Sequence, residues 1–514
     1  MKILIIRTHR LGDILQLTPL LPGLKKKYSG AEITWITGDN FAGILDDHPG
    51  IDELLAIPER EYRYLLADRP DRFPCVYNEM YDFCRLLGRR KFDLVINRQY
   101  EVGSLISFLA GARAVRGGSY SPERSFVMED SASRELYQNV KSDRKGNRMN
   151  LADWSLLIAG LAPGCAPMNL PVTEADRIRA EELIAESERS APIAAVQMGA
   201  GRSFRQWGTE NYRKVIRTIL ERTNYRIVLL GTGEEKEAAD SILGDPSLPQ
   251  GRIVNLAGRT PLKTLRGVLE WCRVLITGDT GTMHMAAAVG TRVIAIFYGT
   301  AYPWETGPYG DGHLILYSRN QCAPCREPEK CGSGQKCRSA IKPDHVWRAF
   351  EIQEAISAGG TARSAGLGED VDLYITAVRE GTGQELIPFP DRSARPGNAL
   401  RRPEVVPGNT VGEIAANLQK KKKDMIRSFY LAHSDAFFSE FSSYIDDLIC
   451  LAGCLQAPDT APDIRNAFES ILPYIGSATA AMQSRDLVSL KDILQYRLDP
   501  FLQEIASPVQ NELR

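Results

Sequence analysis

The chain has 514 residues, of which 43% are hydrophobic and 25% charged, a composition that predicts a folded globular protein of two or three domains. Its formal net charge of −1 provides no strong overall field for attracting nucleic acid, so nucleic acid is not an expected partner. The sequence has no apolar run long enough to span a bilayer, and residues 1–7 are typical of a buried strand rather than of a signal peptide. We therefore expect a cytoplasmic location, with peripheral membrane contact left open.

Strands and helices alternate through the first third of the chain. The expected strands are 2–7, 32–37, 92–96 and 114–116, and the expected helices begin near residue 14 and cover 102–110. Such alternation predicts a parallel sheet covered by helices on both faces. Residues 58–80 and 118–150 are polar and are expected to form irregular loops.

A second series of the same kind begins at residue 193. Its expected strands are 193–197, 226–230, 274–277 and 293–297, and its expected helices are 210–222, 234–243, 262–271 and 280–289. Two such α/β units in tandem leave a cleft between them. Ligands bind at the carboxyl ends of the strands in sheets of this type.

The pattern changes near residue 358. Residues 359–409 are rich in Gly, Pro and Arg and are expected to form a linker, with one candidate strand pair at 371–378 and 385–388. From residue 410 to 514 the apolar residues recur at helical spacing, which predicts an α-helical bundle.

The most informative stretch is GDTGTMHMAAAVG at residues 278–290, at a predicted strand-to-helix turn. Free N–H groups and the positive end of the helix dipole favour a phosphate at such a turn. Thr280, Gly281 and Thr282 would face that phosphate, and Asp279 could hold sugar hydroxyls. His284 is one turn inside the helix, and a single histidine there is more often structural than catalytic.

A second candidate turn, RTHRLGDILQLTP, follows the first strand. Gly12 permits close approach of the backbone to a ligand. Asp13 has two interpretations. From its position alone, an N-cap role is favoured, while the functional alternative is a general base that accepts a proton from an attacking hydroxyl.

The third turn, QMGAGRSFRQW at residues 197–207, combines glycines with two arginines. Its candidate ligand-binding residues are Gly199, Gly201, Ser203 and Arg205, since a planar guanidinium suits a diphosphate. The alternative is a solvated basic loop. Trp207 is expected to pack in the core rather than to stack on a ligand.

Four of the ten cysteines are grouped at Cys322, Cys325, Cys331 and Cys337. Their C-x2-C-x5-C-x5-C spacing predicts a structural zinc or iron site with four thiolate ligands. Free or disulfide-paired thiols are the alternative. We expect no catalytic role for this cluster.

Together the three turns resemble glycosyltransferase family 9, the heptosyltransferase family of lipopolysaccharide core assembly. The resemblance rests on LGD…TP at 11–19, GxG…RxW at 199–207 and GDTG…HxAAA at 278–288, and it covers about residues 1–350. It implies a GT-B fold of two Rossmann-like, doubly wound α/β domains facing a cleft. Residues 1–178 would bind the acceptor, and residues 179–358 would bind the sugar nucleotide.

The resemblance also implies roles for individual residues. Asp13 would be the base of an inverting transfer from an ADP-heptose-type donor, with Gly12 and Arg10 on the acceptor side. Arg205, Asp279 and the turn at 280–282 would hold the donor, together with Gly199, Gly201, Ser203 and His284. No Asp-x-Asp motif stands near these turns, which fits catalysis without a metal or other cofactor.

We therefore predict a metal-independent glycosyltransferase. Its partners would be a sugar-nucleotide donor and a glycan or glycolipid acceptor of the envelope, while peripheral contact with the inner membrane is left open. A heptosyltransferase that modifies proteins and a non-catalytic sugar-nucleotide-binding scaffold are the alternatives. A nicotinamide dehydrogenase is disfavoured, because no GxGxxG follows the first strand.

Overall fold

The computed structural model describes thirteen stretches of the chain, all within its first 389 residues. They are 1–59, 61–62, 73–99, 102–121, 126–128, 130–141, 144–184, 191–201, 203–320, 322–325, 331–332, 334–359 and 370–389. The chain divides into two units, residues 1–391 and 392–514, and everything described belongs to the first. The predicted helical bundle at 410–514 lies outside the described residues.

The first sheet has the strand order β3-β2-β1-β4-β5-β6. Its strands are β1 (Lys2–Ile6), β2 (Glu32–Gly38), β3 (Glu53–Ile57), β4 (Leu94–Asn97), β5 (Ala114–Tyr120) and β6 (Phe126–Met128). All neighbours are parallel except β5 and β6. The β1 strand is buried from Ile3 to Ile6, as expected for a central parallel strand covered on both faces.

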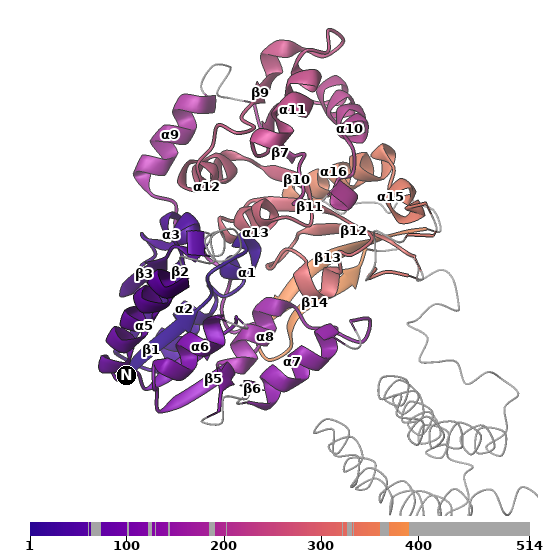
Figure 1. Cartoon of the computed structure of the whole chain (residues 1–514). Helices are drawn as coiled ribbons and strands as arrows, with labels where there is room; N and C mark the ends of the chain where they lie inside the picture. The colour runs from indigo at the N-terminus through magenta and orange to yellow at the C-terminus, as the bar shows by residue number, and fades with distance from the viewer. Residues whose placement is uncertain are drawn as a thin grey trace, which may run out of the picture. The chain divides into compact units, whose positions relative to one another are not determined.

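Helices lie on both sides of this sheet (Figure 1). They are α1 (Leu11–Leu15), α2 (Leu20–Lys27), α3 (Asp39–Leu45), α5 (Phe73–Arg89), α6 (Val102–Leu109), α7 (Ser131–Lys141), α8 (Leu151–Ile158) and, leading into the second sheet, α9 (Glu174–Ile184). The expectation that 58–80 and 118–150 are irregular is wrong where α5, β6 and α7 form. These segments are polar on one face, and their composition concealed the helical pattern.

The second sheet has the order β14-β13-β12-β11-β10-β7-β8-β9. Its strands are β7 (Ile193–Gln197), β8 (Arg226–Leu230), β9 (Ile253–Asn255), β10 (Val274–Gly278), β11 (Arg292–Phe297), β12 (Leu314–Ser318), β13 (Val371–Arg379) and β14 (Gly383–Pro388). The predicted strand pair is therefore present as β13 and β14, which are antiparallel to each other and extend the sheet.

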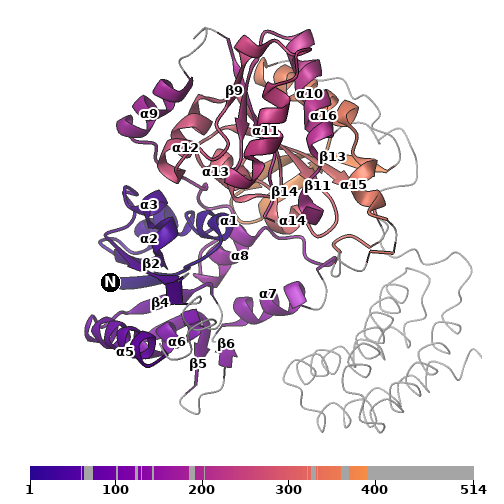
Figure 2. The ribbon, with the colours of Figure 1, turned by 45° about the horizontal axis from the view of Figure 1, so that its top comes forward.

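The helices of this second half complete a doubly wound arrangement, which confirms the predicted α/β, GT-B class (Figure 2). They are α10 (Thr209–Arg222), α11 (Lys236–Leu243), α12 (Leu262–Trp271), α13 (Gly281–Ala288), α14 (Pro303–Thr306), α15 (Lys336–Ala340) and α16 (Pro343–Ser357), with 3₁₀ turns η2 (Ser203–Arg205), η3 (Gly233–Glu235) and η4 (Gln250–Arg252). No helix in the described ranges is both long enough and apolar enough to cross a membrane.

In each sheet there is one point at which the strand order changes direction, and the candidate turns lie at these two points. In the first sheet β1 lies between β2 and β4, and in the second β7 lies between β8 and β10. The loops that leave neighbouring strands in opposite directions open a crevice at such a point. The turns after β1, β7 and β10 contain the three sequence motifs.

A buried carboxylate ties the two halves together at the β13–β14 hairpin. Asp153 of α8 accepts hydrogen bonds from the backbone N–H of Gly164 (2.8 Å), the N–H of Gln384 (2.8 Å) and the Tyr309 hydroxyl (2.7 Å). Its side chain is fully buried. Because three donors satisfy this carboxylate, burying it without a cation is tolerated, and the hairpin is fixed against the first half.

Candidate active site

Asp13 lies inside helix α1 rather than at its cap. The N-cap position belongs to Arg10, which has φ 64° and makes no side-chain capping bond. The N-cap interpretation of Asp13 is therefore wrong. The carboxylate is 23% exposed and pairs with the guanidinium of Arg7, which also donates to the carbonyl of Arg98. A partly exposed carboxylate held in this way is available to a substrate.

Helix α1 lies directly against helix α13, and both views of the ribbon show the two side by side (Figures 1 and 2). A Cβ added to Gly12 would lie 2.6 Å from Cδ2 of His284. A Cβ added to Gly281 would lie 3.0 Å from the side chain of Leu11. The first and third motifs are thus packed together, although some 270 residues separate them.

The charge of Asp13 acts on two further candidate residues. Burial raises the pKa of Asp279, and the charge of Asp13 raises it further, whereas Arg205 and the hydroxyl of Thr306 lower it. Burial lowers the pKa of His284 to about 4, against a small opposing effect of Asp13. His284 is therefore neutral at pH 7, and its Nδ1 has no hydrogen-bond partner within the described structure.

The start of α13 has the form of an anion-binding helix terminus. Thr280 is the N-cap, and its hydroxyl accepts a hydrogen bond from the N–H of Met283 at 3.3 Å. Gly281 and Thr282 are the first two helical residues, whose N–H groups have no partner inside the helix. These groups suit a phosphate oxygen. The Thr280 hydroxyl is already used by the cap.

Arg205 lies at the end of the 3₁₀ turn η2 that begins at Ser203. Its Nε donates to the hydroxyl of Thr300 at 2.9 Å, and its Nη1 lies 3.2 Å from Oδ2 of Asp279. Its side chain is 36% exposed, so the cation is oriented by protein groups but open to a ligand.

The two glycines of the second motif have different surroundings. A Cβ on Gly199 would meet the carboxyl group of Glu235 at 2.2 Å, so a larger residue there would displace the carboxylate that completes the capping box of η3. Gly201 has open space around it. The prediction for Trp207 is confirmed, since it is 1% exposed and its indole N–H donates to the carbonyl of Ile341 at 2.9 Å.

Two arginines of the site were missed from the sequence. Arg7 ends the first predicted strand, and nothing in that pattern separates it from a strand terminus. Arg144 lies in a segment expected to be irregular, yet its charge acts on Asp279. The bond of Arg7 to the carbonyl of Arg98 and the effect of Arg144 on Asp279 join distant parts of the chain, which no local pattern reports.

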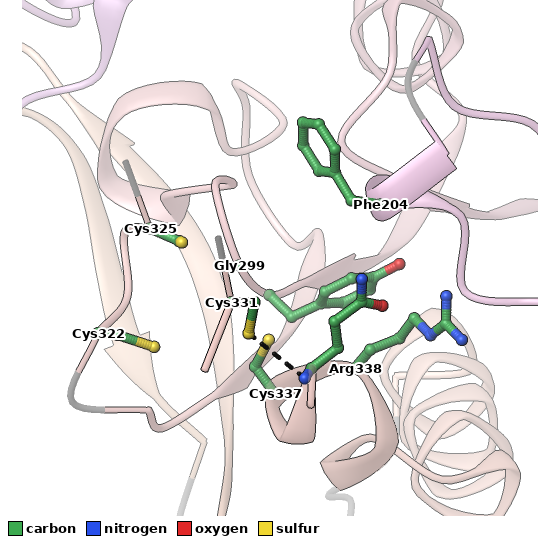
Figure 3. Close-up of a pocket in the computed structure, with 9 residues that line it drawn as sticks. Phe204, Gly299, Cys322, Cys325, Cys331, Cys337 and Arg338 are labelled. Carbon is green, nitrogen blue, oxygen red and sulfur yellow. Dashed lines mark hydrogen bonds between the residues drawn. The ribbon is translucent and has the colours of Figure 1, made fainter. Parts of the chain in front are cut away.

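The four grouped cysteines line one pocket, together with Phe204, Tyr298, Gly299, Gln335 and Arg338 (Figure 3). The N–H of Gln335 donates to the sulfur of Cys331 at 3.4 Å. Burial, and then the neighbouring Cys322 and Cys331, raise the pKa of the Cys337 thiol. Within the described ranges no three His, Cys, Asp or Glu side chains are arranged so that they could hold a metal ion. Metal binding here therefore stays a prediction.

Comparison with known proteins agrees with this geometry. Residues 80–334 match the model of glycosyltransferase family 9 (heptosyltransferase). The chain carries a family 9 domain, and the protein is a glycosyltransferase. Lipopolysaccharide heptosyltransferase 1 of Pseudomonas aeruginosa is 25% identical over 326 residues, which cover 63% of this chain and 86% of the relative. The enzyme of the same name from Salmonella typhimurium is 24% identical over 322 residues, covering 62% and 95%.

Solved structures support the same fold. A family 9 glycosyl transferase from Veillonella parvula aligns with a TM-score of 0.56 and 20% identity, covering 68% of this chain and 96% of its own. The E. coli ADP-heptose lipopolysaccharide heptosyltransferase II aligns with a TM-score of 0.52 and 18% identity, covering 70% and 100%. At these identities the likeness establishes the architecture of the two sheets.

Replacing Gly12 by alanine is expected to destabilise the contact between α1 and α13 by about 1–3 kcal/mol, as overpacking of a closed interior does. The reason is the enclosed His284 ring 2.6 Å from the new Cβ. Urea unfolding and the rate of sugar transfer would both be measured. Gly251→Ala is the matched control, since a Cβ there would also have open space and η4 lies outside the three motifs, and an equal loss in both variants would contradict this account.

Stability is expected to fall as the pH drops from about 6.5 toward 4, because His284 binds a proton less readily in the folded chain than in the unfolded one. The full effect of this residue is about 3 kcal/mol. Burial lowers the pKa of His48 and His313 too, so the test compares wild type with His284→Gln. The variant should show a shallower loss of urea midpoint between pH 7.5 and 4.5, and identical slopes would contradict the prediction.

Proposed function

We propose that this glycosyltransferase transfers a heptose from ADP-heptose to a hydroxyl group of a lipopolysaccharide-core-like or other envelope glycan, with inversion at the anomeric carbon. The names of the relatives support the donor and the acceptor class. The assignment of the two substrates to the two domains, as predicted from the sequence, is part of the proposal. Residues 1–178 bind the acceptor, and residues 179–358 bind the donor.

One observation carries the proposal, namely the contact between helix α1 and the first turn of α13. Gly12 packs against His284 and Gly281 against Leu11, and the charge of Asp13 acts on Asp279, which supports a site shared by Asp13, Asp279 and the amides of Gly281 and Thr282. Asp13 takes the proton of the acceptor hydroxyl while the oxygen of that hydroxyl attacks the anomeric carbon. The bond to the diphosphate breaks, and the negative charge that leaves is met by those amides and by Arg205.

The remaining candidates have supporting roles. Asp279 holds hydroxyls of the sugar, Thr280 lies at the phosphate with Gly281, and His284 shapes the wall beside them. Gly199, Gly201 and Ser203 let the second turn approach the diphosphate. Arg10 is exposed at the start of α1 on the acceptor side, next to Gly12. A cytoplasmic location, with contact with the inner membrane left open, and a structural zinc or iron bound by the four cysteines remain predictions from the sequence.

The test combines a donor screen with an acceptor screen. Thermal shift with ADP-, GDP- and UDP-sugars identifies the nucleotide, because a ligand of the folded state raises its melting temperature. Transfer from ADP-heptose is then measured with a heptose-free lipopolysaccharide core and with a polypeptide acceptor. We expect the glycan to be modified. Modification of the polypeptide alone, or binding of donor without transfer to either, would contradict the proposal.

The metal prediction has its own measurement. Elemental analysis of the purified chain should find one zinc or iron per molecule, and the variant Cys331→Ser/Cys337→Ser should lose it. A metal-free chain with four titratable thiols would contradict the prediction.

A further inference from the structure

The segment that starts at Arg144 lies against the turn that follows β11. Arg144 donates to the carboxylate of Glu305 through two nitrogens. Its Nε lies 3.2 Å from Oε1 and 3.0 Å from Oε2, and its Nη2 lies 2.5 Å from Oε2. Its Nη1 donates to the carbonyl of Thr300 at 3.3 Å. The Glu305 side chain is only 3% exposed, and that of Arg144 is 21% exposed. Arg144 thus neutralises a buried carboxylate and fixes the backbone of Thr300 at the same time.

Thr300 also contacts Arg205. Its hydroxyl accepts the hydrogen bond from Nε of Arg205 at 2.9 Å, while Nη1 of Arg205 lies 3.2 Å from Asp279. The carbonyl of Thr300 is therefore used by Arg144 and its hydroxyl by Arg205. This series of contacts runs from Glu305 through Arg144 and Thr300 to the cation of the donor site.

Neighbouring contacts hold the same two segments together. Asn150 donates to the carbonyl of Gly307 at 3.1 Å, and the Tyr302 hydroxyl donates to the carbonyl of Lys145 at 2.8 Å. Arg148 lies over the ring of Trp304, 4.3 Å from its centroid. Arg144 is also near enough to Asp279 for its charge to lower the pKa of that carboxyl, against the larger effect of burial.

We propose that Arg144 is a positioning residue for the donor: by holding Thr300 and Glu305, it orients Arg205 toward the diphosphate. The inference rests on the proposed function for the identity of that ligand. The planar fork of arginine matters here, since one side chain must reach a carboxylate with two nitrogens and a carbonyl with the third. A lysine could replace the charge but not all of these bonds.

The test separates positioning from simple support of the fold. In Arg144→Met, Glu305 becomes a buried carboxylate without a partner, which destabilises the protein. In Arg144→Met/Glu305→Gln that charge is removed, so the melting temperature should recover most of its loss. We expect the Kd for ADP, measured by calorimetry, and the KM for ADP-heptose to rise roughly tenfold in both variants. Arg144→Lys should recover part of this loss.

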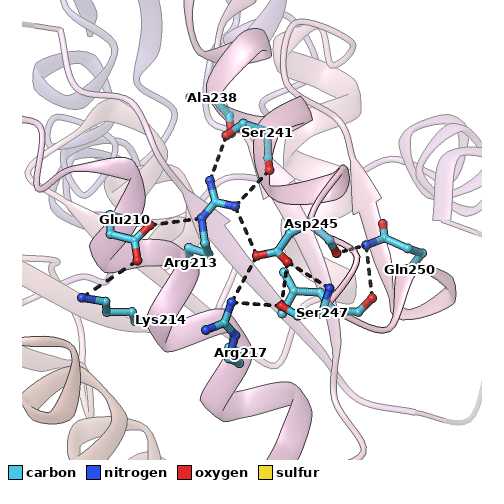
Figure 4. A network of polar contacts seen from close by, with 10 residues as sticks. Glu210, Arg213, Lys214, Arg217, Ala238, Ser241, Asp245, Ser247 and Gln250 are labelled. Carbon is cyan, nitrogen blue, oxygen red and sulfur yellow. Dashed lines mark hydrogen bonds and ion pairs between the residues drawn. The ribbon is translucent and has the colours of Figure 1, made fainter.

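Arg213 provides the matched control, because its side chain is also 21% exposed and pairs with a carboxylate, Asp245, at 3.2 Å. It belongs to a surface network of α10 and the turn after α11 that includes none of the site residues (Figure 4). Arg213→Met should change the melting temperature without changing the Kd for ADP.

A folded double variant whose Kd for ADP and KM for ADP-heptose are within twofold of wild type would overturn the role of Arg144. Failure of the wild-type chain to transfer sugar would instead count against the proposed function. That activity is measured separately from the comparison of Kd and KM between variant and wild type.

Discussion

Replacing Asp13 by asparagine is expected to lower kcat by about 10²–10⁴-fold, the range that a positioned general base contributes. Asparagine keeps the shape of the side chain but cannot accept the proton of the acceptor hydroxyl. The Kd for ADP should change little, because the proposed diphosphate contacts come from α13 and Arg205. The measurements are transfer of heptose to the glycan acceptor and calorimetric binding of ADP.

Asp39→Asn is the control for this experiment. Asp39 also lies in the first turn of a helix that follows a parallel strand, α3 after β2, and it is exposed. That variant should retain full activity. An Asp13→Asn enzyme with more than a tenth of the wild-type kcat would show that another group takes the proton.

Replacing Arg205 by methionine is expected to lower kcat/KM by about 10²–10³-fold, as the loss of one group that stabilises developing negative charge does. The guanidinium is preorganised by Thr300 and Asp279 before any ligand arrives. Arg205→Lys should keep more activity than the methionine variant, since the charge remains while the bond to Thr300 is weakened. Steady-state kinetics with varied ADP-heptose would measure both losses.

Arg217→Met serves as the comparison here. Its side chain is 40% exposed and pairs with Asp245 at 3.1 Å, close to the 36% exposure and 3.2 Å ion pair of Arg205. Loss of activity in both variants would point to a general effect of removing a surface cation. A loss confined to Arg205 supports a direct contact with the donor.

Much of the fold could be predicted because local patterns of buried and polar residues determine its strands and turns. Buried runs such as 193–197 and 226–230 became β7 and β8, and the turns that follow the central strands marked the edge where the site lies. Two doubly wound sheets follow from this alternation. The resemblance to family 9 added candidate roles for individual residues, and those roles await the experiments above.

What could not be predicted depends on contacts between distant segments. Helix starts attract aspartate, which favours Asp13 as an N-cap from the sequence, but the N-cap is Arg10, whose φ is 64°, so the helix starts three residues earlier than that interpretation requires. Helix α7 is mostly polar, so its composition predicts a loop. Arg144 and Glu305 are 161 positions apart and find each other only in the folded chain.

The close fit of Gly12 against His284 has a consequence for how sequences of this kind can diverge. A methyl group at position 12 and an imidazole at position 284 compete for one space, so neither position can drift independently of the other. Natural homologues with a larger residue at the first position should carry a smaller one at the second. Such paired replacements among homologues would reflect the contact between the two halves of the protein at this point.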